Sequence, residues 1–510
     1  MFVVADVIDS MSTCGTKSEL MCAAEPELTP LSGRVGIKCR ASDMALNCRS
    51  GYCQSALINI NCGGLITERT VWMRGGTMGA IEARLDALDD LVMAGVSLGL
   101  AHCAAQDDQL DGRVITVDGR RLVSFGSCSY LGLETHPELV AAVVDSVTRY
   151  GSQFSSSRTY LSAPGYAPAE AALTEMFGRP ALISPSTTMG HLAALPVVVG
   201  SDDVVLLDAQ VHFSVQVAAR LVQADGIPVE LLPHGDLGRL ERRVVELART
   251  HRRVWYMTDG IYSMYADPAP IAQLSGLAER HPNLWLYIDD AHAISWTGRF
   301  GRGYALERLS AAAAERAIVT GSLNKSFAAA GGVLTFPNPE LRRRVFALGG
   351  ALIFSGPVQP PMLGAILASA RLHLTDAVAP RRARLNQLID LFNRLAAEHD
   401  LPVVSPSATP IRCVGVGKPP LTYRVAELLR DAGFFVDIAT SPAVPAKRSG
   451  IRISLTAHHT DQDVVKLVET LTAALPQALA EGGSSMSELR RAFGRQLAGR
   501  VLPSPREPAE

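Results

Sequence analysis

The chain has 510 residues, of which 47% are hydrophobic and 19% are charged, a composition that suits a large globular protein of two or more domains. Its 48 basic and 50 acidic residues leave a net charge of -2, so no basic field indicates nucleic acid as a partner and small molecules are expected instead. No apolar run approaches the roughly 20 residues that cross a bilayer, and the amino terminus lacks the order of a secretory signal, so we expect a cytoplasmic protein without membrane contact.

Cysteines are concentrated near the start of the chain. Those before residue 63 are Cys14, Cys22, Cys39, Cys48, Cys53 and Cys62, whereas the remaining cysteines are scattered. Zinc is one explanation, but structural zinc sites usually combine closely paired cysteines with further cysteines or histidines, and no histidine precedes His102. The segment also lacks helical or alternating periodicity. We therefore predict a disordered, cysteine-rich extension over residues 1–75 without a metal, or sequence upstream of the true start, with Met73 and Met78 as candidate starts.

Ordered structure is predicted from residue 76 onward. Apolar residues recur at helical spacing over residues 79–98, which predicts an amphipathic helix. Two short apolar runs then flank Asp118-Gly119, a dipeptide that favours a tight hairpin turn, so residues 76–125 are expected to hold a helix and a hairpin. A further helix is predicted over residues 136–150, because its second residue is a proline, which suits a first helical turn.

Residues 180–332 repeat a pattern of apolar strand, polar turn and helical segment. This alternation predicts βαβ units in an α/β fold, with a mainly parallel central sheet and helices on both faces. Because ligands of open α/β sheets bind outside the carboxyl ends of the strands, we expect the polar residues that follow these strands to share one site. They are Ser186, Thr187 and Thr188; His212; Asp259 and Ser263; Asp289, Asp290 and His292; and Ser322 and Lys325.

Each of these residues also has an ordinary structural explanation. Lys325 alone is explained as a surface lysine, His212 as a hydrogen-bonded histidine and Asp259 as a helix cap. Together, however, they supply what pyridoxal phosphate needs. A lysine can hold an aldehyde, an aspartate can keep a pyridine nitrogen protonated, an imidazole can stack on the ring, and hydroxyls with free N–H groups at a helix start can bind phosphate. The sequence therefore predicts a pyridoxal phosphate site around Lys325.

Six short stretches carry a resemblance to a known family. They are residues 129–133 (SYLGL), 208–212 (DAQVH), 259–264 (DGIYSM), 288–292 (IDDAH), 322–325 (SLNK) and 451–456 (IRISLT). From Val123 to about Leu475 the chain resembles the α-oxoamine synthases, which include 8-amino-7-oxononanoate synthase and serine palmitoyltransferase. These are pyridoxal-phosphate enzymes of fold type I, so the resemblance implies that fold and that cofactor.

The resemblance also implies roles for single residues. Lys325 is expected to form the Schiff base with the cofactor, Asp289 to pair with the pyridine nitrogen, and His292 to contact the ring hydroxyl. His212 is expected to stack on the ring and to act as an acid near the thioester carbonyl. Arg452 matches the arginine that takes the amino-acid carboxylate, a task that suits its planar fork of hydrogen-bond donors.

Cofactor contacts are further expected from the hydroxyls of Thr187, Thr188, Ser263, Ser322 and Ser355. The family usually has a Gly-Phe or similar pair and an asparagine where this chain has residues 186–191 (STTMGH). Residues 322–328 (SLNKSFA) and 354–357 (FSGP) resemble instead the amino-ketone autoinducer synthases of quorum sensing. Near the second of these stretches the family receives a phosphate contact from the partner subunit, so a symmetric homodimer with shared sites is expected.

These patterns divide the rest of the chain into three parts. We predict a large cofactor-binding domain over residues 126–356 and a smaller α/β domain over residues 357–480, with strands near 410–416 and 434–438. Residues 481–510 are rich in glycine, serine, arginine and proline, so we predict a weakly ordered tail that includes a short helix near residues 487–497.

The expected activity is the decarboxylative condensation of a small amino acid with an acyl thioester, carried by coenzyme A or a carrier protein, to give an α-amino ketone. An aminotransferase of the same fold is the alternative, because it would use the same lysine and aspartate but leave the thioester untouched. A non-catalytic, cofactor-binding regulatory protein would have no need for Lys325, both aspartates and Arg452 together.

Overall fold

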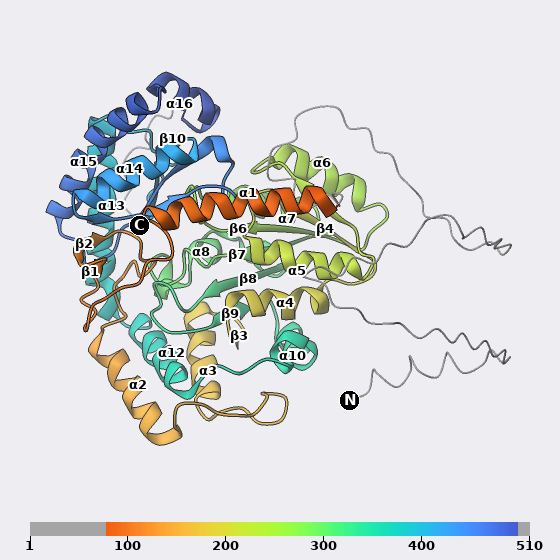
Figure 1. Ribbon diagram of the computed structural model, residues 1–510. Helices are drawn as coiled ribbons and strands as arrows, with labels where there is room; N and C mark the ends of the chain where they lie inside the picture. The colour runs from red at the N-terminus through yellow and green to blue at the C-terminus, as the bar shows by residue number, and fades with distance from the viewer. Residues whose placement is uncertain (1–77, 498–510) are drawn as a thin grey trace, which may run out of the picture. The chain divides into compact units, whose positions relative to one another are not determined.

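The protein is described here by a computed structural model that places residues 78–497 (Figure 1). The predicted extension over residues 1–75 and the last residues of the predicted tail, 498–510, lie outside these described residues. No single helix among residues 78–497 is long and apolar enough to cross a membrane. One pair of consecutive helices, Pro360–His373 and Asp376–Glu398, is long and apolar enough when the two are taken together, but the pair is bent by 87° at the break between them.

The largest sheet confirms the predicted α/β fold. Within residues 78–497 it has seven strands in the order β3-β9-β8-β7-β6-β4-β5, and all neighbours are parallel except those of β9, which is antiparallel to both β3 and β8. Their bounds are β3 Ala181–Ser184, β4 Asp203–Asp208, β5 Val229–Leu232, β6 Arg253–Asp259, β7 Leu284–Asp289, β8 Ala317–Ser322 and β9 Gly332–Thr335. The four parallel neighbours β8, β7, β6 and β4 therefore end at the same edge of the sheet.

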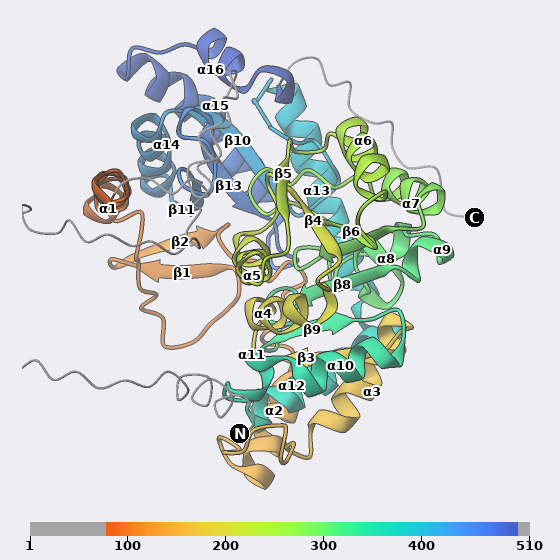
Figure 2. The ribbon, with the colours of Figure 1, turned by 90° about the vertical axis from the view of Figure 1, so that its right-hand side faces the viewer.

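Helices cover both faces of this sheet because its strands are apolar on both sides. Val205, Leu207 and Met257 point to the face covered by α4 (Thr187–Val198) and α5 (Phe213–Ala224). Their strand neighbours Leu206 and Tyr256 pack on the opposite face, against α6 (Leu237–Leu247) and α7 (Ile271–Arg280). Figure 2 shows these two helix pairs on opposite sides of the strands.

Further helices complete the large part of the chain. A third apolar cluster joins α3 (Tyr166–Phe177) and α12 (Pro360–His373) to β3 and β9, and α2 (Pro137–Tyr150) packs on α12. The remaining helices of this part are α8 (Tyr304–Arg308), α9 (Ala311–Ala314), α10 (Pro339–Leu348) and α11 (Gly350–Ile353). Helix α2 confirms the helix that was predicted over residues 136–150.

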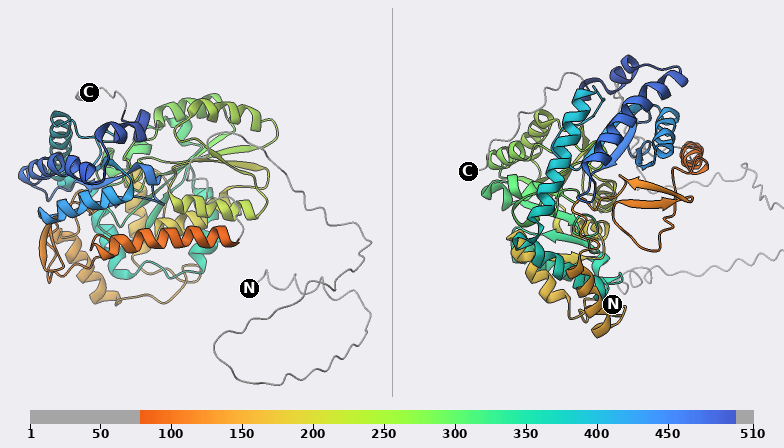
Figure 3. Two further views of the ribbon diagram at one scale, coloured as in Figure 1. Left: turned by 45° about the horizontal axis from the view of Figure 1, so that its top comes forward. Right: turned by 90° about the vertical axis from the view of Figure 1, so that its left-hand side faces the viewer.

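The predicted hairpin is also present. Strands β1 (Val114–Val117) and β2 (Arg120–Ser124) pair antiparallel around Asp118 and Gly119, which have φ angles of 50° and 72°. Positive φ at both central residues is what a type I′ hairpin turn requires. Preceding the hairpin, α1 (Met78–Ser97), the helix at the red end of the colours in Figure 3, confirms the predicted helix. Its apolar side chains Leu85 and Val92 are 50% and 37% exposed, so the expected apolar stripe is not fully buried.

A smaller C-terminal domain carries its own sheet, in the order β10-β13-β12. Its strands are β10 (Ile411–Gly417), β12 (Asp437–Ala439) and β13 (Ser449–Ser454), and its helices are α13 (Ala379–Glu398), α14 (Pro419–Asp431) and α15 (Asp461–Glu481). The strand predicted over residues 434–438 is divided. Phe434–Phe435 (β11) pairs parallel with β2, whereas β12 pairs with β13, because the chain crosses at Val436 from one sheet to the other.

The expectation of a weakly ordered tail from residue 481 does not hold for its first part. The predicted short helix is α16 (Met486–Phe493), and its Leu489 and Phe493 side chains are buried. Phe493 meets the ring of Tyr265 edge-on, with ring centroids 6.4 Å apart, and Arg448 Nε donates to the Ala492 carbonyl. The helix is amphipathic, so it is held by packing despite the polar composition around it.

Candidate active site

Acidic and hydroxyl side chains end four neighbouring strands of the large sheet. Asp208, Asp259, Asp289 and Ser322 are the last residues of β4, β6, β7 and β8. Asp259 lies directly opposite Asp289 in the strand register. Strand order therefore brings together groups that are far apart in the chain, at the edge where ligands of α/β sheets bind.

Lys325 lies in the turn after β8, beside His292. The Lys325 Nζ atom is 2.8 Å from His292 Nε2, and His292 Nδ1 is 2.8 Å from the hydroxyl of Tyr130. Burial lowers the pKa of Lys325, although the Asp289 carboxylate opposes this change. Burial, and then the charge of Lys325, lower the pKa of His292 well below its usual value, so that ring is neutral. An amine with a lowered pKa is the form of lysine that attacks a carbonyl group.

Asp289 is a buried carboxylate with two described hydrogen bonds. Its Oδ1 atom accepts from the backbone N–H of Ala291 at 3.0 Å, and its Oδ2 atom lies 3.1 Å from His191 Nε2. Burial would raise the pKa of Asp289, but the bond from His191 and the nearby positive charges outweigh burial and lower it. Burial, and then Asp289, raise the pKa of neighbouring Asp259 well above its usual value. Asp289 is therefore the carboxylate of the pair that keeps its charge.

His212 caps the start of α5 beside a cavity. Its backbone N–H donates to Asp259 Oδ1 at 2.9 Å, and its Nδ1 atom lies 2.6 Å from Ser214 Oγ. Desolvation of the His212 ring lowers its pKa, although part of the residue is exposed. The cavity has a volume of about 350 Å³ and is lined in part by Phe213, Leu231, Ser263, Met264 and Pro442.

Arg452 of β13 is buried and already paired. Its Nε atom donates to the Ser263 carbonyl at 2.8 Å, and its NH1 group bonds Asp437 Oδ2 at 2.7 Å. Its NH2 group lies 3.5 Å from Cys128 Sγ, and the side chain lines a second cavity of about 360 Å³ that also includes Met264. A substrate carboxylate at Arg452 would therefore share the guanidinium with Asp437.

The start of α4 provides a candidate phosphate cradle. Ser186 caps this helix, and Thr187 Oγ1 donates to the Gly321 carbonyl at 3.1 Å. Thr187 and Thr188 are the first two helical residues, so their backbone N–H groups have no partner within the helix. A Cβ atom at Gly332 would lie 2.6 Å from the Thr187 backbone nitrogen, so only glycine permits this close approach.

The other predicted serines differ in position. Ser322 is buried at the end of β8, and its hydroxyl bonds Asn324 Oδ1. Ser263 contributes its carbonyl to Arg452 and lines the cavity beside His212. Ser355 belongs to a separate segment after α11, where its hydroxyl donates to the Ala351 carbonyl at 2.6 Å.

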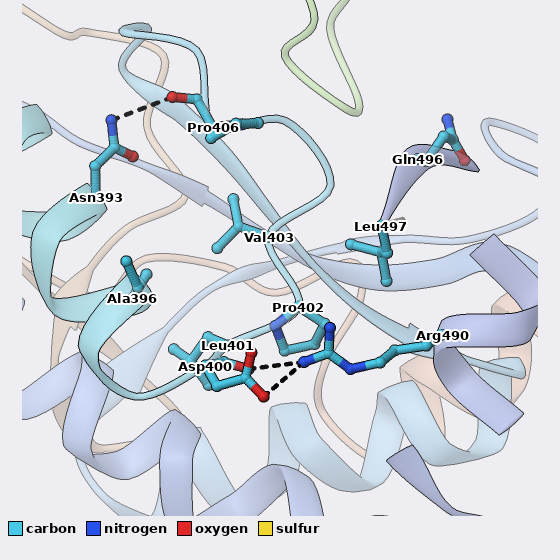
Figure 4. Close-up of a pocket in the computed structure, with 11 residues that line it drawn as sticks. Asn393, Ala396, Asp400, Leu401, Pro402, Val403, Pro406, Arg490, Gln496 and Leu497 are labelled. Atoms are coloured by element: carbon cyan, nitrogen blue, oxygen red, sulfur yellow. Dashed lines mark hydrogen bonds and ion pairs between the residues drawn. The ribbon is translucent and has the colours of Figure 1, made fainter. Parts of the chain in front are cut away.

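The residues that the structure brings together fit pyridoxal phosphate. A partly buried lysine suits the aldehyde, a buried anionic aspartate suits a protonated pyridine nitrogen, and the start of α4 suits the phosphate. Among the described residues, a separate cavity of about 340 Å³ lies between α13 and α16 (Figure 4). It is bordered by the ion pair of Arg490 and Asp400 and contains none of the predicted site residues.

Sequence reasoning missed several residues that belong to this arrangement. Tyr130 lies inside a family motif without an assigned role, and Cys128 precedes that motif. His191 was noted only as a departure from the family. Its position five residues into a helix that follows a strand was the available signal, because the first turns of such a helix face the strand ends.

Comparisons with known proteins give the family. The family model described as aminotransferase class I and II matches residues 120–471. The 8-amino-7-oxononanoate synthase of Stutzerimonas stutzeri is 34% identical over 363 residues, which cover 71% of this chain and 89% of that protein. The enzyme of the same name from Maricaulis maris is 31% identical over 376 residues, with 73% and 91% covered.

Solved structures show the same fold. A serine palmitoyltransferase of Sphingomonas wittichii superposes with a TM-score of 0.72 at 21% identity, covering 79% of this chain and 99% of that one. An 8-amino-7-oxononanoate synthase of Francisella tularensis has a TM-score of 0.58 at 24% identity, with 69% and 97% covered. A variant of another serine palmitoyltransferase, from S. paucimobilis, was solved with a bound aldimine of pyridoxal phosphate and myriocin. The chain therefore belongs to the aminotransferase class I and II family and, within it, to the α-oxoamine synthases, which are pyridoxal-phosphate enzymes of fold type I.

Proposed function

We propose that this protein condenses an amino acid with an acyl thioester and releases carbon dioxide, free thiol and an α-amino ketone. The observation that carries the proposal is the partly buried Lys325 amine, 2.8 Å from His292 and close to a charged Asp289, in a chain whose curated relatives are 8-amino-7-oxononanoate synthases. The proposed substrates are a small amino acid and an acyl group on coenzyme A or a carrier protein.

We assign the cofactor contacts as follows. Lys325 holds the aldehyde of pyridoxal phosphate, Asp289 holds a proton on the pyridine nitrogen, and His292 contacts the ring hydroxyl. When bound, the cofactor supplies the electron sink that stabilises a carbanion next to the amino group. Its phosphate is bound by the first turn of α4 and by Ser322, with Ser263 as a further contact.

The remaining steps are assigned to side chains around the substrates. Lys325, once released from the aldehyde, takes the Cα proton of the amino acid, and Arg452 binds the carboxylate. His212 stacks on the cofactor ring, and its position beside the apolar cavity of about 350 Å³ makes it the acid for the thioester carbonyl. The carbon–sulfur bond breaks as the new carbon–carbon bond forms, and the carboxyl group then leaves as carbon dioxide.

We further propose a homodimer. Tyr160 and Phe354 are 87% and 86% exposed, and Leu161 beside them is also exposed. The Ser157 hydroxyl donates to the Ile353 carbonyl at 2.7 Å, which ties these two segments together into one apolar surface. We propose that a second copy of the chain covers this surface, because Ser355 beside it is the residue expected to reach the neighbouring site.

A cytoplasmic location and a domain boundary after residue 356 are also our proposals.

A single experiment separates the proposed reaction from the alternatives. The protein is expected to show the absorbance of a bound cofactor and to release free thiol when both an amino acid and an acyl-coenzyme A are added. An aminotransferase would leave the thioester intact and form a keto acid from the amino acid. A regulatory protein would bind the cofactor and consume neither substrate.

A further inference from the structure

His191 connects the strand that carries Asp289 to helix α4. Its side chain is fully buried, and its two ring nitrogens meet two residues of β7: Nε2 lies 3.1 Å from Asp289 Oδ2 and Nδ1 lies 2.8 Å from the Tyr287 hydroxyl. Tyr287 and Asp289 are two residues apart in a strand, so their side chains point to the same face, the one that α4 covers. One histidine therefore contacts both side chains.

The hydrogen-bond partners define how this histidine is oriented. Burial, and then the charge of Asp289, raise the pKa of Tyr287 well above its usual value, so the phenol keeps its proton. The phenol can then donate to His191 Nδ1, which leaves the Nε2–H to donate to Asp289. With Ala291 N–H on Oδ1 and His191 on Oδ2, the carboxylate is fixed at both oxygens, and each oxygen retains a free lone pair.

The same contact distinguishes the two neighbouring carboxylates. Asp259 and Asp289 are opposite one another on adjacent buried strand ends, where two negative charges repel. The groups that face Asp289 are His191 on α4, His212 at the start of α5, Asp259 on β6 and Lys325 after β8. Only Asp289 receives the His191 bond, whereas Asp259 accepts from the backbone of His212.

We propose that His191 is a positioning residue, which holds the Asp289 carboxylate ionised and directed at the pyridine nitrogen, and that Tyr287 fixes the orientation of the His191 ring. The proposal rests on cofactor binding within the proposed function and does not depend on the acyl transfer step. It assigns a role to a side chain that does not itself touch the substrates.

The test uses the cofactor-loaded enzyme before any substrate is added. Two quantities are measured: the dissociation constant of pyridoxal phosphate and the pH midpoint of the absorbance change of the bound cofactor. While the pyridine ring carries a proton, its positive charge disfavours a second positive charge near Lys325. If the ring loses that proton, the second charge persists to higher pH, so the midpoint rises. Because Asp289 would lose the bond that helps to keep it ionised, His191→Phe should weaken cofactor binding roughly tenfold or more and raise the midpoint.

Two further variants separate positioning from mere packing. His191→Gln keeps a side-chain N–H donor near the position of Nε2, so both quantities should lie between those of the wild type and of His191→Phe. His459→Asn removes another buried histidine, in the smaller domain, and should change neither quantity. A folded His191→Phe protein with wild-type affinity and midpoint would overturn the proposal.

Tyr287→Phe keeps the proposal testable if His191→Phe does not fold. It removes only the hydroxyl that orients His191, so the midpoint should rise, by less than in a His191 variant. An unchanged midpoint in folded Tyr287→Phe would contradict the proposed role of Tyr287 in orienting His191. Because no substrate is present, absence of the condensation reaction would leave these results unaffected.

Discussion

The amine of Lys325 and the imidazole of His292 lie 2.8 Å apart, where Lys325 is partly buried and His292 is buried. Burial disfavours the charged form of both groups and lowers the pKa of each, that of His292 to well below its usual value. A neutral imidazole has one N–H and one acceptor nitrogen, so one ring nitrogen of His292 can bond Tyr130 while the other bonds the lysine. These contacts hold the Lys325 amine in place.

Lys325→Ala should abolish the cofactor adduct that borohydride reduction fixes to the protein. The variant removes the one amine that the site offers to the aldehyde and leaves the surrounding fold intact, so circular dichroism should be unchanged. Mass spectrometry of the reduced protein measures the adduct. Lys466→Ala, at an exposed position of α15, is the matched control and should keep it. An adduct that persists on Lys325→Ala would place the Schiff base elsewhere.

Part of the site could be predicted at the scale of residues, and part could not. Lys325, Asp289 and His292 follow strands that the apolar pattern revealed, so their convergence was predictable. The pairing of Arg452 with Asp437 was not, because it depends on the register that sets Asp437 opposite Arg452 across β12 and β13. The role of His191 depends in the same way on how α4 packs against β7.

At the scale of elements, the start of α4 is fixed by its closeness to β9. Gly332 opens β9 and pairs with both Ser184 and Ser322 in the strand registers. Its Cα hydrogens face the backbone of Thr187, where a side chain would collide. The candidate phosphate cradle is therefore built from a helix start and a glycine on a neighbouring strand.

Gly332→Ala should weaken cofactor binding, because the added methyl group would push the first turn of α4 out of place. Equilibrium dialysis with pyridoxal phosphate measures the effect, and a loss of roughly tenfold or more corresponds to about 1.4 kcal/mol. Gly276→Ala in α7 adds a methyl group that meets only the far end of Arg280, so it is the control and should bind as the wild type. Equal affinity in the two variants would show that the approach of Gly332 to Thr187 is not needed.

Periodicity predicted some elements better than others. The hairpin around Asp118-Gly119 and α2 were found because their turn and cap signals are local. The segment Phe434–Ala439 has one apolar run but serves two sheets, which no local pattern reveals. The composition around α16 favoured disorder, yet its apolar face is buried on the C-terminal sheet, a tertiary effect that overrides composition.

At the scale of the whole molecule, stability should depend on pH through His234. This histidine bridges Asp208 at 2.9 Å and Asp267 at 2.7 Å. Burial would lower the pKa of His234, but the bonds to Asp208 and Asp267 outweigh burial and raise it to about 10. A raised pKa in the folded state means that the stabilisation is complete below the unfolded value of about 6.5 and is lost as pH rises through the folded value.

Denaturant unfolding of the wild type and of His234→Gln tests this dependence. Between about pH 7 and about pH 9 the wild type should lose on the order of 2 kcal/mol more than the variant, at 1.36 kcal/mol for each unit of pKa. The difference between the two proteins isolates His234 from other groups that titrate in this range. Parallel pH profiles for the two proteins would mean that the bridge does not carry a charge.

The assembly of the molecule is tested by analytical ultracentrifugation. The wild type should sediment as a dimer, and Phe354→Asp should shift it toward monomer because a charge would be buried between the copies. Val245→Asp, at a partly exposed position of α6, is the control and should leave the dimer intact. A wild type that is monomeric when loaded with cofactor would rule out shared sites.

In the proposed reaction, carbon–carbon bond formation precedes loss of the carboxyl group. A carboxylate β to a new ketone leaves easily, whereas the carboxylate of the free amino acid does not, so release should depend on the thioester. The decisive measurement follows small amino acids labelled at the carboxyl carbon, with acyl thioesters of graded length. We expect labelled carbon dioxide and free thiol in equal amounts, and no carbon dioxide without thioester. Accumulation of the labelled keto acid with the thioester intact would contradict the claim and identify an aminotransferase.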